Sequence, residues 1–177
     1  MKDSDFFELF VFEQVLKDYD LSQDELESGR VNGSDDGGID GFFLLINGSL
    51  VEETIDKSDY KKTNPQFDLY IIQAKREKSF GEKAYDKFQG LAKNILTFDI
   101  DKHTLTDSYS EAVVDAIQLF QESYLELIDL HPRLVVHFVC ATKGDTGQIN
   151  ARLKQKEDMV IRIAKETERS ARQGKRG

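Results

Sequence analysis

The sequence has little of what cross-links or interrupts a fold. Its 177 residues include one cysteine and two prolines, and no apolar run approaches the roughly 20 residues that a membrane-spanning helix needs. Cys140 has no partner for a disulfide bond, which is typical of a cytoplasmic protein, and in the run LVVHFVC we expect it to be a small buried hydrophobe. The acidic N-terminus, MKDSDFFELF, lacks the basic region of a signal peptide, so we expect no signal peptide, and we expect no membrane among the partners of the protein.

Several motifs that would indicate a function are also missing. The chain has no Walker-type glycine loop, no CxxC pair for a metal cluster, and no serine, histidine and acid set for a hydrolase triad. The three histidines are scattered, and the glycines of GSDDGGIDG precede an expected strand rather than a helix, unlike a dinucleotide-binding fingerprint. The sequence therefore does not indicate a common nucleotide-binding protein, a zinc-cluster protein or a hydrolase with a catalytic triad.

Charge is unevenly distributed along the chain. The net charge is −9, which is unusual for a protein that binds nucleic acid. Residues 75–93, however, carry 6 basic and 3 acidic side chains, and residues 152–177 carry 9 basic and 4 acidic ones. Local positive potential, rather than net charge, attracts a phosphate backbone. The alternative is that both segments are solvated helix faces.

Hydrophobic periodicity predicts an α/β fold with the order α-β-β-β-α-α-β-α. We expect a small mixed sheet of about four strands flanked by helices. The first helix is apolar almost all round, so we expect most of its surface to be buried. Asn47-Gly48 predicts a tight hairpin, and Pro132 ends a helix. The expected helices are 4–19, 80–98, 108–129 and 148–172, with a short capped turn or helix at 22–28; the expected strands are 39–46, 49–55, 67–74 and 133–142.

One domain accounts for the whole length, residues 1–177. Its last part, residues 148–177, is expected to be a charged helix that ends in SARQGKRG without a strand partner. We therefore expect the chain to be the N-terminal part of a longer protein.

An acid at the start of one strand and a tripeptide on another carry the chemistry that we expect. Asp40 lies in DGGIDGFFLLI, and Gln73, Ala74 and Lys75 lie in DLYIIQAKR. Mg²⁺ prefers oxygen ligands and retains several waters, so the Asp40 carboxylate, the Gln73 amide oxygen and the Ala74 carbonyl form a sufficient set. Lys75 is two residues beyond Gln73, so both side chains lie on the same face of a strand. A lysine in this position can orient or help to deprotonate an attacking water and neutralise phosphate charge.

These residues resemble the PD-(D/E)xK nuclease superfamily in its Q-x-K variant. DGGIDG followed by IIQAKR is similar to Mrr-type restriction endonucleases. The stretches FFELFVFEQVLKDYDLSQDELESG, GSDDGGIDGFFLLING and YIIQAKREKSF are more similar to the N-terminal nuclease-like domain of the AIPR (abortive-infection phage-resistance) proteins of bacteria. The resemblance covers roughly residues 5–145 and is tight only in 5–48 and 68–80.

The resemblance implies a restriction-endonuclease-like fold with a mixed sheet of about four strands flanked by helices, a divalent metal, Mg²⁺ or Mn²⁺, and DNA cleavage in antiviral defence. Asp40 matches the metal aspartate of the family, Gln73 its second acidic position and Lys75 its lysine. Gln73 departs from the commoner acid, and a neutral ligand weakens metal binding. Family members often add a glutamate from the first helix; Glu13 and Glu8 compete for this role and point about 140° apart. Glu13 is favoured, because a charge on a helix expected to be buried needs a reason.

DNA is the expected partner, through its phosphate backbone. The basic side chains that directly follow Lys75 are expected to contact phosphates rather than bases. A homodimer is a further expected assembly. Two alternatives stay open: a catalytically inactive nuclease-fold module that binds nucleic acid or protein, and a nuclease that acts on RNA. The expected phosphate-contacting residues are Arg76, Lys78, Lys83 and Lys87.

Overall fold

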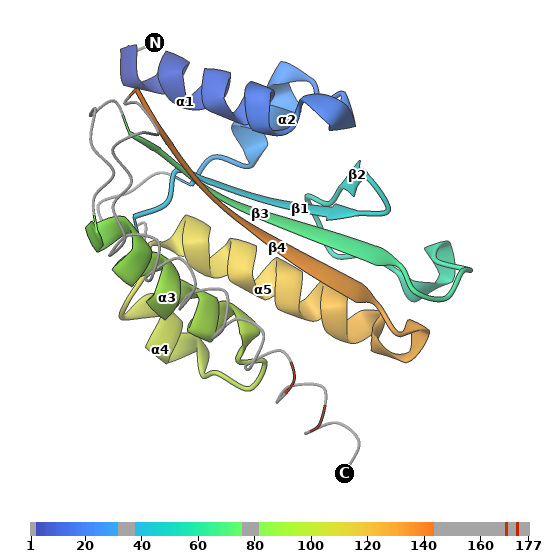
Figure 1. Cartoon of the computed structure of the whole chain (residues 1–177). Helices are drawn as coiled ribbons and strands as arrows, with labels where there is room; N and C mark the ends of the chain where they lie inside the picture. The colour runs from blue at the N-terminus through green and yellow to red at the C-terminus, as the bar shows by residue number, and fades with distance from the viewer. Residues whose placement is uncertain (1–2, 32–37, 76–81, 144–168, 170–172, 174–177) are drawn as a thin grey trace.

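The computed structural model describes residues 3–31, 38–75, 82–143, 169 and 173 (Figure 1). Within them the elements follow the expected α/β order, and β4 has the expected bounds. The charged helix expected over 148–172 lies outside the described residues. The helices are α1 (Asp3–Val15), α2 (Gln23–Ser28), α3 (Glu82–Leu96), α4 (Lys102–Thr106) and α5 (Glu111–Glu126), the strands are β1 (Gly41–Ile46), β2 (Ser49–Leu50), β3 (Gln66–Lys75) and β4 (Arg133–Thr142), and three 3-10 turns cover Lys17–Tyr19, Lys57–Asp59 and Ile128–Leu130.

The strands form one mixed four-stranded sheet, as the sequence predicts, and their order is β2-β1-β3-β4. β1 pairs antiparallel with β2 and β3, whereas β3 and β4 are parallel. The β1–β2 hairpin turns at Asn47 and Gly48, whose φ angles of 52° and 84° are those of the tight turn that Asn-Gly favours. The return strand is shorter than expected, because ladder pairing stops at Leu50 and the acidic residues that follow it are exposed.

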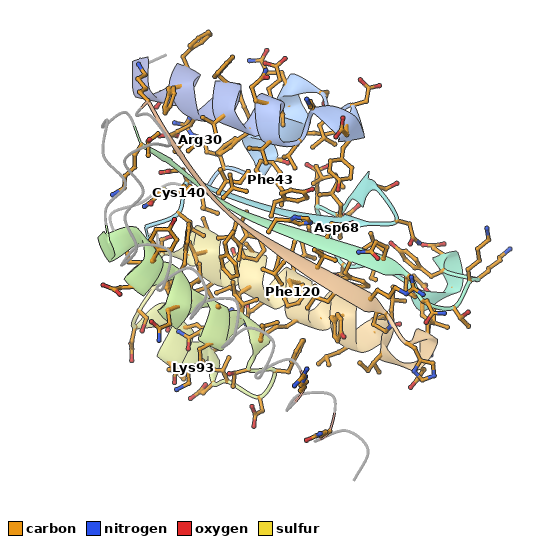
Figure 2. The ribbon with its side chains drawn as sticks, in the orientation of Figure 1. Arg30, Phe43, Asp68, Lys93, Phe120 and Cys140 are labelled. Atoms are coloured by element: carbon orange, nitrogen blue, oxygen red, sulfur yellow. The ribbon has the colours of Figure 1, made fainter. Side chains whose placement is uncertain are left out.

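Helices cover both faces of the sheet (Figure 1). α1 and α2 lie on one face, and α3, α4 and α5 lie on the other. Each face has its own buried cluster, and Figure 2 shows Phe43 on the α1 side and Phe120 on the α5 side. The ring of Phe43 packs edge-on against Phe12 of α1, with 5.2 Å between the ring centres. Side chains of a strand alternate between the faces, so β1, β3 and β4 each contribute to both clusters.

The expectation that the first helix is buried on most of its surface is wrong. α1 buries Val11 and Phe12 against the sheet, and Leu16 follows directly after the helix. Phe6 and Phe10 lie on the opposite side and are 69% and 49% exposed. The reason is that α1 lies on the outside of a single sheet, so that only one of its sides has a partner within the described residues.

The connection between the parallel strands determines where the ends of the strands meet. β3 leads into α3, α4 and α5 before the chain returns to β4, so the two strands end at the same edge of the sheet. Gln73 pairs with Cys140 and Lys75 with Thr142 there. α4 was not expected from the sequence; Asp101 caps it by accepting a hydrogen bond from the backbone N–H of His103. Among the described helices, none has the length and apolar character needed to cross a membrane.

Candidate active site

Asp40, Gln73 and Lys75 come together at the end of the sheet where β1 begins and β3 ends. Gly41 pairs with Ile72 in the antiparallel ladder, so Asp40 lies opposite Gln73. Gln73 and Lys75 follow Ile71 at alternate positions of β3, and Ile71 belongs to the cluster that faces α3 and α5. Both side chains therefore lie on this face, as their spacing predicts.

Asp40 is held by its backbone and by its side chain. Its N–H donates to the carbonyl of Ile72 at 2.8 Å, and its own carbonyl accepts from Val31 at 3.0 Å. The carboxylate oxygen Oδ2 accepts a hydrogen bond from the backbone N–H of Ala74 at 2.6 Å. The half-buried carboxylate is thus fixed against the QAK tripeptide, with one of its oxygens occupied by a main-chain donor.

Gln73 is buried, with 4% of its surface exposed, and its amide is hydrogen-bonded at both ends. Nε2 donates to the carbonyl oxygen of Gly38, and Oε1 accepts from Sγ of Cys140 at 3.6 Å. A carbonyl acceptor on one side and a thiol on the other orient the amide, so that Oε1 faces β4. The side chain therefore ties the loop before β1 to both parallel strands.

The Ala74 carbonyl points toward the same side as Asp40. In a strand the N–H and C=O of one residue point in the same direction, and the Ala74 N–H points at the Asp40 carboxylate. The Lys75 side chain points to the opposite face of the sheet from that of Ala74, the same face as Gln73, and is half-buried. An aspartate carboxylate, an amide oxygen and a main-chain carbonyl are thus all present at this end of the sheet.

Cys140 is a member of this site that the sequence did not indicate. Figure 2 shows it on β4, where its thiol contacts Gln73. Burial raises the pKa of the thiol, the charge of Lys75 lowers this pKa, and the charge of Asp40 raises it. The charges of Asp40 and Lys75 therefore both act on one sulfur atom. Cys140 is half-buried at this site rather than fully enclosed in the core.

Lys87 reaches the site from α3. Its side chain passes over Gly38, so that a Cβ added to Gly38 would lie 3.0 Å from the Lys87 Nζ. Gly38 is the residue whose carbonyl accepts from Gln73, which places the Lys87 ammonium beside the site. Of the other expected phosphate contacts, Arg76 and Lys78 lie outside the described residues. Lys83 belongs to α3, but its side chain also lies outside the described part.

The expected contribution of Glu13 is corrected by the structure. Glu13 is exposed on α1, on the other face of the sheet, and it lines a surface groove with Phe6 and Phe10. Its competitor Glu8 is half-buried and accepts a hydrogen bond from Arg30 Nε at 2.8 Å. A glutamate on the exposed side of α1 needs no buried partner, so the argument from burial does not apply to Glu13.

The oxygen atoms at this end of the sheet fit a weakly held divalent metal. Asp40 supplies the only carboxylate of the expected set, and the described residues contain no cluster of three or more histidine, cysteine or acidic side chains placed to hold a metal. Mg²⁺ is commonly held by one or two carboxylates and completes its coordination with waters and substrate phosphates. The Asp40 carboxylate and the Ala74 carbonyl are compatible with that mode, whereas Gln73 Oε1 faces β4 and would join them only if the amide turned over.

Comparisons with known proteins gave no match to a family model, to a curated protein or to a solved structure.

Proposed function

We propose that this chain is a metal-dependent DNA endonuclease domain of a prokaryotic defence or restriction system. It would be a Q-x-K member of the PD-(D/E)xK superfamily, similar to the N-terminal domain of AIPR proteins. The observation that carries the proposal is the hydrogen bond from the Ala74 N–H to the Asp40 carboxylate. It joins residues 34 positions apart in the sequence, and it holds the aspartate against the strand that carries Gln73 and Lys75.

Each residue has a separate role in this mechanism. Asp40 and the Ala74 carbonyl, together with Gln73 Oε1 once it is released from the Cys140 thiol, would hold a divalent metal, which would supply charge stabilisation at the phosphate and a more acidic water. The Ala74 N–H keeps the carboxylate of Asp40 in place. Lys75 donates a hydrogen bond to a phosphate oxygen or to the attacking water, and thereby orients it in line with the leaving oxygen.

The DNA backbone is contacted by basic residues around α3. Lys87 already lies beside Gly38, next to the proposed metal ligands. Arg76, Lys78 and Lys83 follow Lys75 in the sequence and extend the positive segment of residues 75–93. Contacts of lysine and arginine with phosphate position a duplex without reading its sequence. A cytoplasmic location and a homodimer belong to the same proposal.

One observation favours a second candidate, a nuclease fold that binds nucleic acid without cutting it. Gln73 stands where an acid is commoner, and both ends of its amide are already hydrogen-bonded. A neutral, fully engaged side chain is a poor metal ligand, whereas the two lysines would still bind phosphate. An RNA substrate is compatible with either candidate, because backbone phosphates are common to both nucleic acids.

Nicking of supercoiled plasmid DNA tests the proposal. The chain is incubated with Mg²⁺ or Mn²⁺, with EDTA as the metal-free arm, and Lys75→Ala and Asp40→Asn are compared with Lys93→Ala. Lys93 is an exposed lysine of α3 (Figure 2), so it controls for loss of a surface charge. We expect metal-dependent nicking that only the first two variants abolish. Binding without nicking in every metal would support the inactive module instead, and single-stranded RNA in a parallel arm identifies an RNA nuclease.

A further inference from the structure

We propose that the Asp40 end of the sheet binds a DNA phosphate before it binds a metal. Lys75 and a second lysine, Lys87, would contact this phosphate, and Lys87 can reach the site because Gly38 has no side chain. This inference rests on the proposed function, because it assigns an order of binding to the same site. The divalent metal would then enter together with the phosphate rather than ahead of it.

Gly38 creates the room for Lys87. Its φ angle of +78° lies in the left-handed region, where glycine is favoured over residues with a side chain. A Cβ at this position would overlap the Lys87 Cδ and would lie 3.0 Å from Nζ. The missing side chain therefore lets the lysine of α3 lie across the loop that carries Asp40. Because Gly38 also accepts the hydrogen bond from Gln73, the ammonium lies next to the buried amide.

The ionised side chains that meet here favour an anion. Among the described residues of the site, Lys75 and Lys87 contribute two positive charges and Asp40 contributes one negative charge. Gln73 contributes none, where an acid would have made the balance neutral. One oxygen of the Asp40 carboxylate is moreover occupied by the Ala74 N–H. Surplus positive charge repels a dication and attracts a phosphate group, and because Lys87 is exposed and Lys75 is half-buried, both effects should weaken with added salt.

A bound phosphate would reverse this balance. It adds negative charge, and its oxygens are the ligands that the site lacks for Mg²⁺ or Mn²⁺. Metal and DNA would then bind with positive coupling, and by linkage each raises the affinity for the other by the same factor. The free protein would bind the metal weakly, and DNA without metal would bind measurably.

The first test measures binding of a labelled DNA duplex by fluorescence anisotropy in EDTA, over a series of salt concentrations. Wild-type protein is expected to bind, and Lys87→Gln should reduce the log–log salt slope by about 0.9, the value for one phosphate contact. Lys93→Gln is the matched control, an exposed lysine on the same helix, and should leave the slope unchanged. Absence of metal-free binding, or equal effects of the two variants, would overturn the proposal.

A second test uses two glycines with similar backbones. Gly38 and Gly48 have φ angles of +78° and +84°, but a Cβ on Gly48 would meet nothing within 4 Å. Both Gly38→Ala and Gly48→Ala should lower thermal stability through backbone strain, Gly38→Ala somewhat more because its Cβ would displace the Lys87 side chain, and only Gly38→Ala should weaken DNA binding. In a Lys87→Gln background, Gly38→Ala should cause no further loss of affinity. Equal binding losses in the two alanine variants, or additive losses in the double variant, would show that Gly38 does not act through Lys87.

The third test addresses the order of binding. Mn²⁺ is titrated calorimetrically into wild-type protein and into Gln73→Glu, each without DNA. The acid should raise Mn²⁺ affinity at least about tenfold, as expected for a second carboxylate ligand, and should weaken duplex binding in EDTA. Tight Mn²⁺ binding by the wild type without DNA would refute this order even if the chain nicks plasmid. Absence of nicking refutes the proposed function and leaves the phosphate site to be judged by the two binding tests.

Discussion

The carboxylate of Asp40 accepts a 2.6 Å hydrogen bond from the backbone N–H of Ala74. This contact joins the loop before β1 to the central residue of the QAK tripeptide, and it leaves the Ala74 carbonyl pointing to the same side. The aspartate thus has a structural role in addition to its proposed role as a metal ligand. The two roles can be separated by substitution.

Asp40→Asn and Asp40→Ala should both abolish nicking, but they should differ in stability. The asparagine retains an oxygen that can accept from Ala74, so the loss in the free energy of unfolding should stay below about 1 kcal/mol. The alanine leaves a partly buried N–H without its acceptor and should cost about 1–3 kcal/mol. Urea denaturation of both variants checks this difference. Equal stability of both variants and the wild type would show that the hydrogen bond contributes nothing to the fold.

The thiol of Cys140 should report the charges of its neighbours. Burial raises its pKa, so the protonated thiol contributes stability that is complete below about pH 8.5, the unfolded value, and is lost as the pH rises through the folded pKa. Asp40→Asn removes a charge that raises this pKa and should lower it, whereas Lys75→Gln should raise it further. The pH dependence of alkylation by iodoacetamide measures these shifts at the only cysteine of the chain. Unchanged profiles in both variants would place the two charges away from the sulfur.

Local sequence patterns were enough to predict most elements and the pairing of Asp40 with the QAK tripeptide. The apolar run of residues 133–142 matched β4 in both bounds, and Asn47-Gly48 formed the expected turn. Such features depend on residues close in sequence, where periodicity and turn geometry act directly. Neighbouring strands then bring together the residues at their ends, which is why two short motifs located the candidate site.

The partners that close the site could not be predicted in this way. Cys140 meets Gln73 only because β3 and β4 are parallel with one particular register, and Lys87 meets Gly38 only because α3 packs over the loop. The choice between Glu8 and Glu13 failed for a similar reason. Arg30 is the partner that holds Glu8, and no local pattern connects residues 22 positions apart.

Arg30 should make Glu8 sensitive to substitution and leave Glu13 insensitive. Arg30 donates to Glu8 at 2.8 Å and to Asp5 at 2.6 Å, and the three side chains are between 17% and 28% exposed. Glu8→Gln weakens a charge-assisted pair that is largely shielded from water and should cost about 1–2 kcal/mol. Glu13→Gln, on the exposed side of the same helix, should change stability by less than about 0.5 kcal/mol. Thermal denaturation measures the stability of the two variants. A larger loss of stability for Glu13→Gln than for Glu8→Gln would show that Glu13, and not Glu8, has the stabilising partner.

Substitution of a phenylalanine of α1 should affect stability according to the side of the helix on which the residue lies. Phe12 is fully buried and packs against Phe43, so Phe12→Ala should cost about 3–5 kcal/mol through the cavity that it leaves. Phe6 and Phe10 are 69% and 49% exposed, and Phe6→Ser or Phe10→Ser should change stability by no more than about 0.5 kcal/mol. Urea denaturation at several protein concentrations makes the comparison, since a patch that packs against a second copy would make the effect of the serines depend on concentration. A loss of several kcal/mol in a serine variant at every concentration would mean that this side of α1 is covered within one chain.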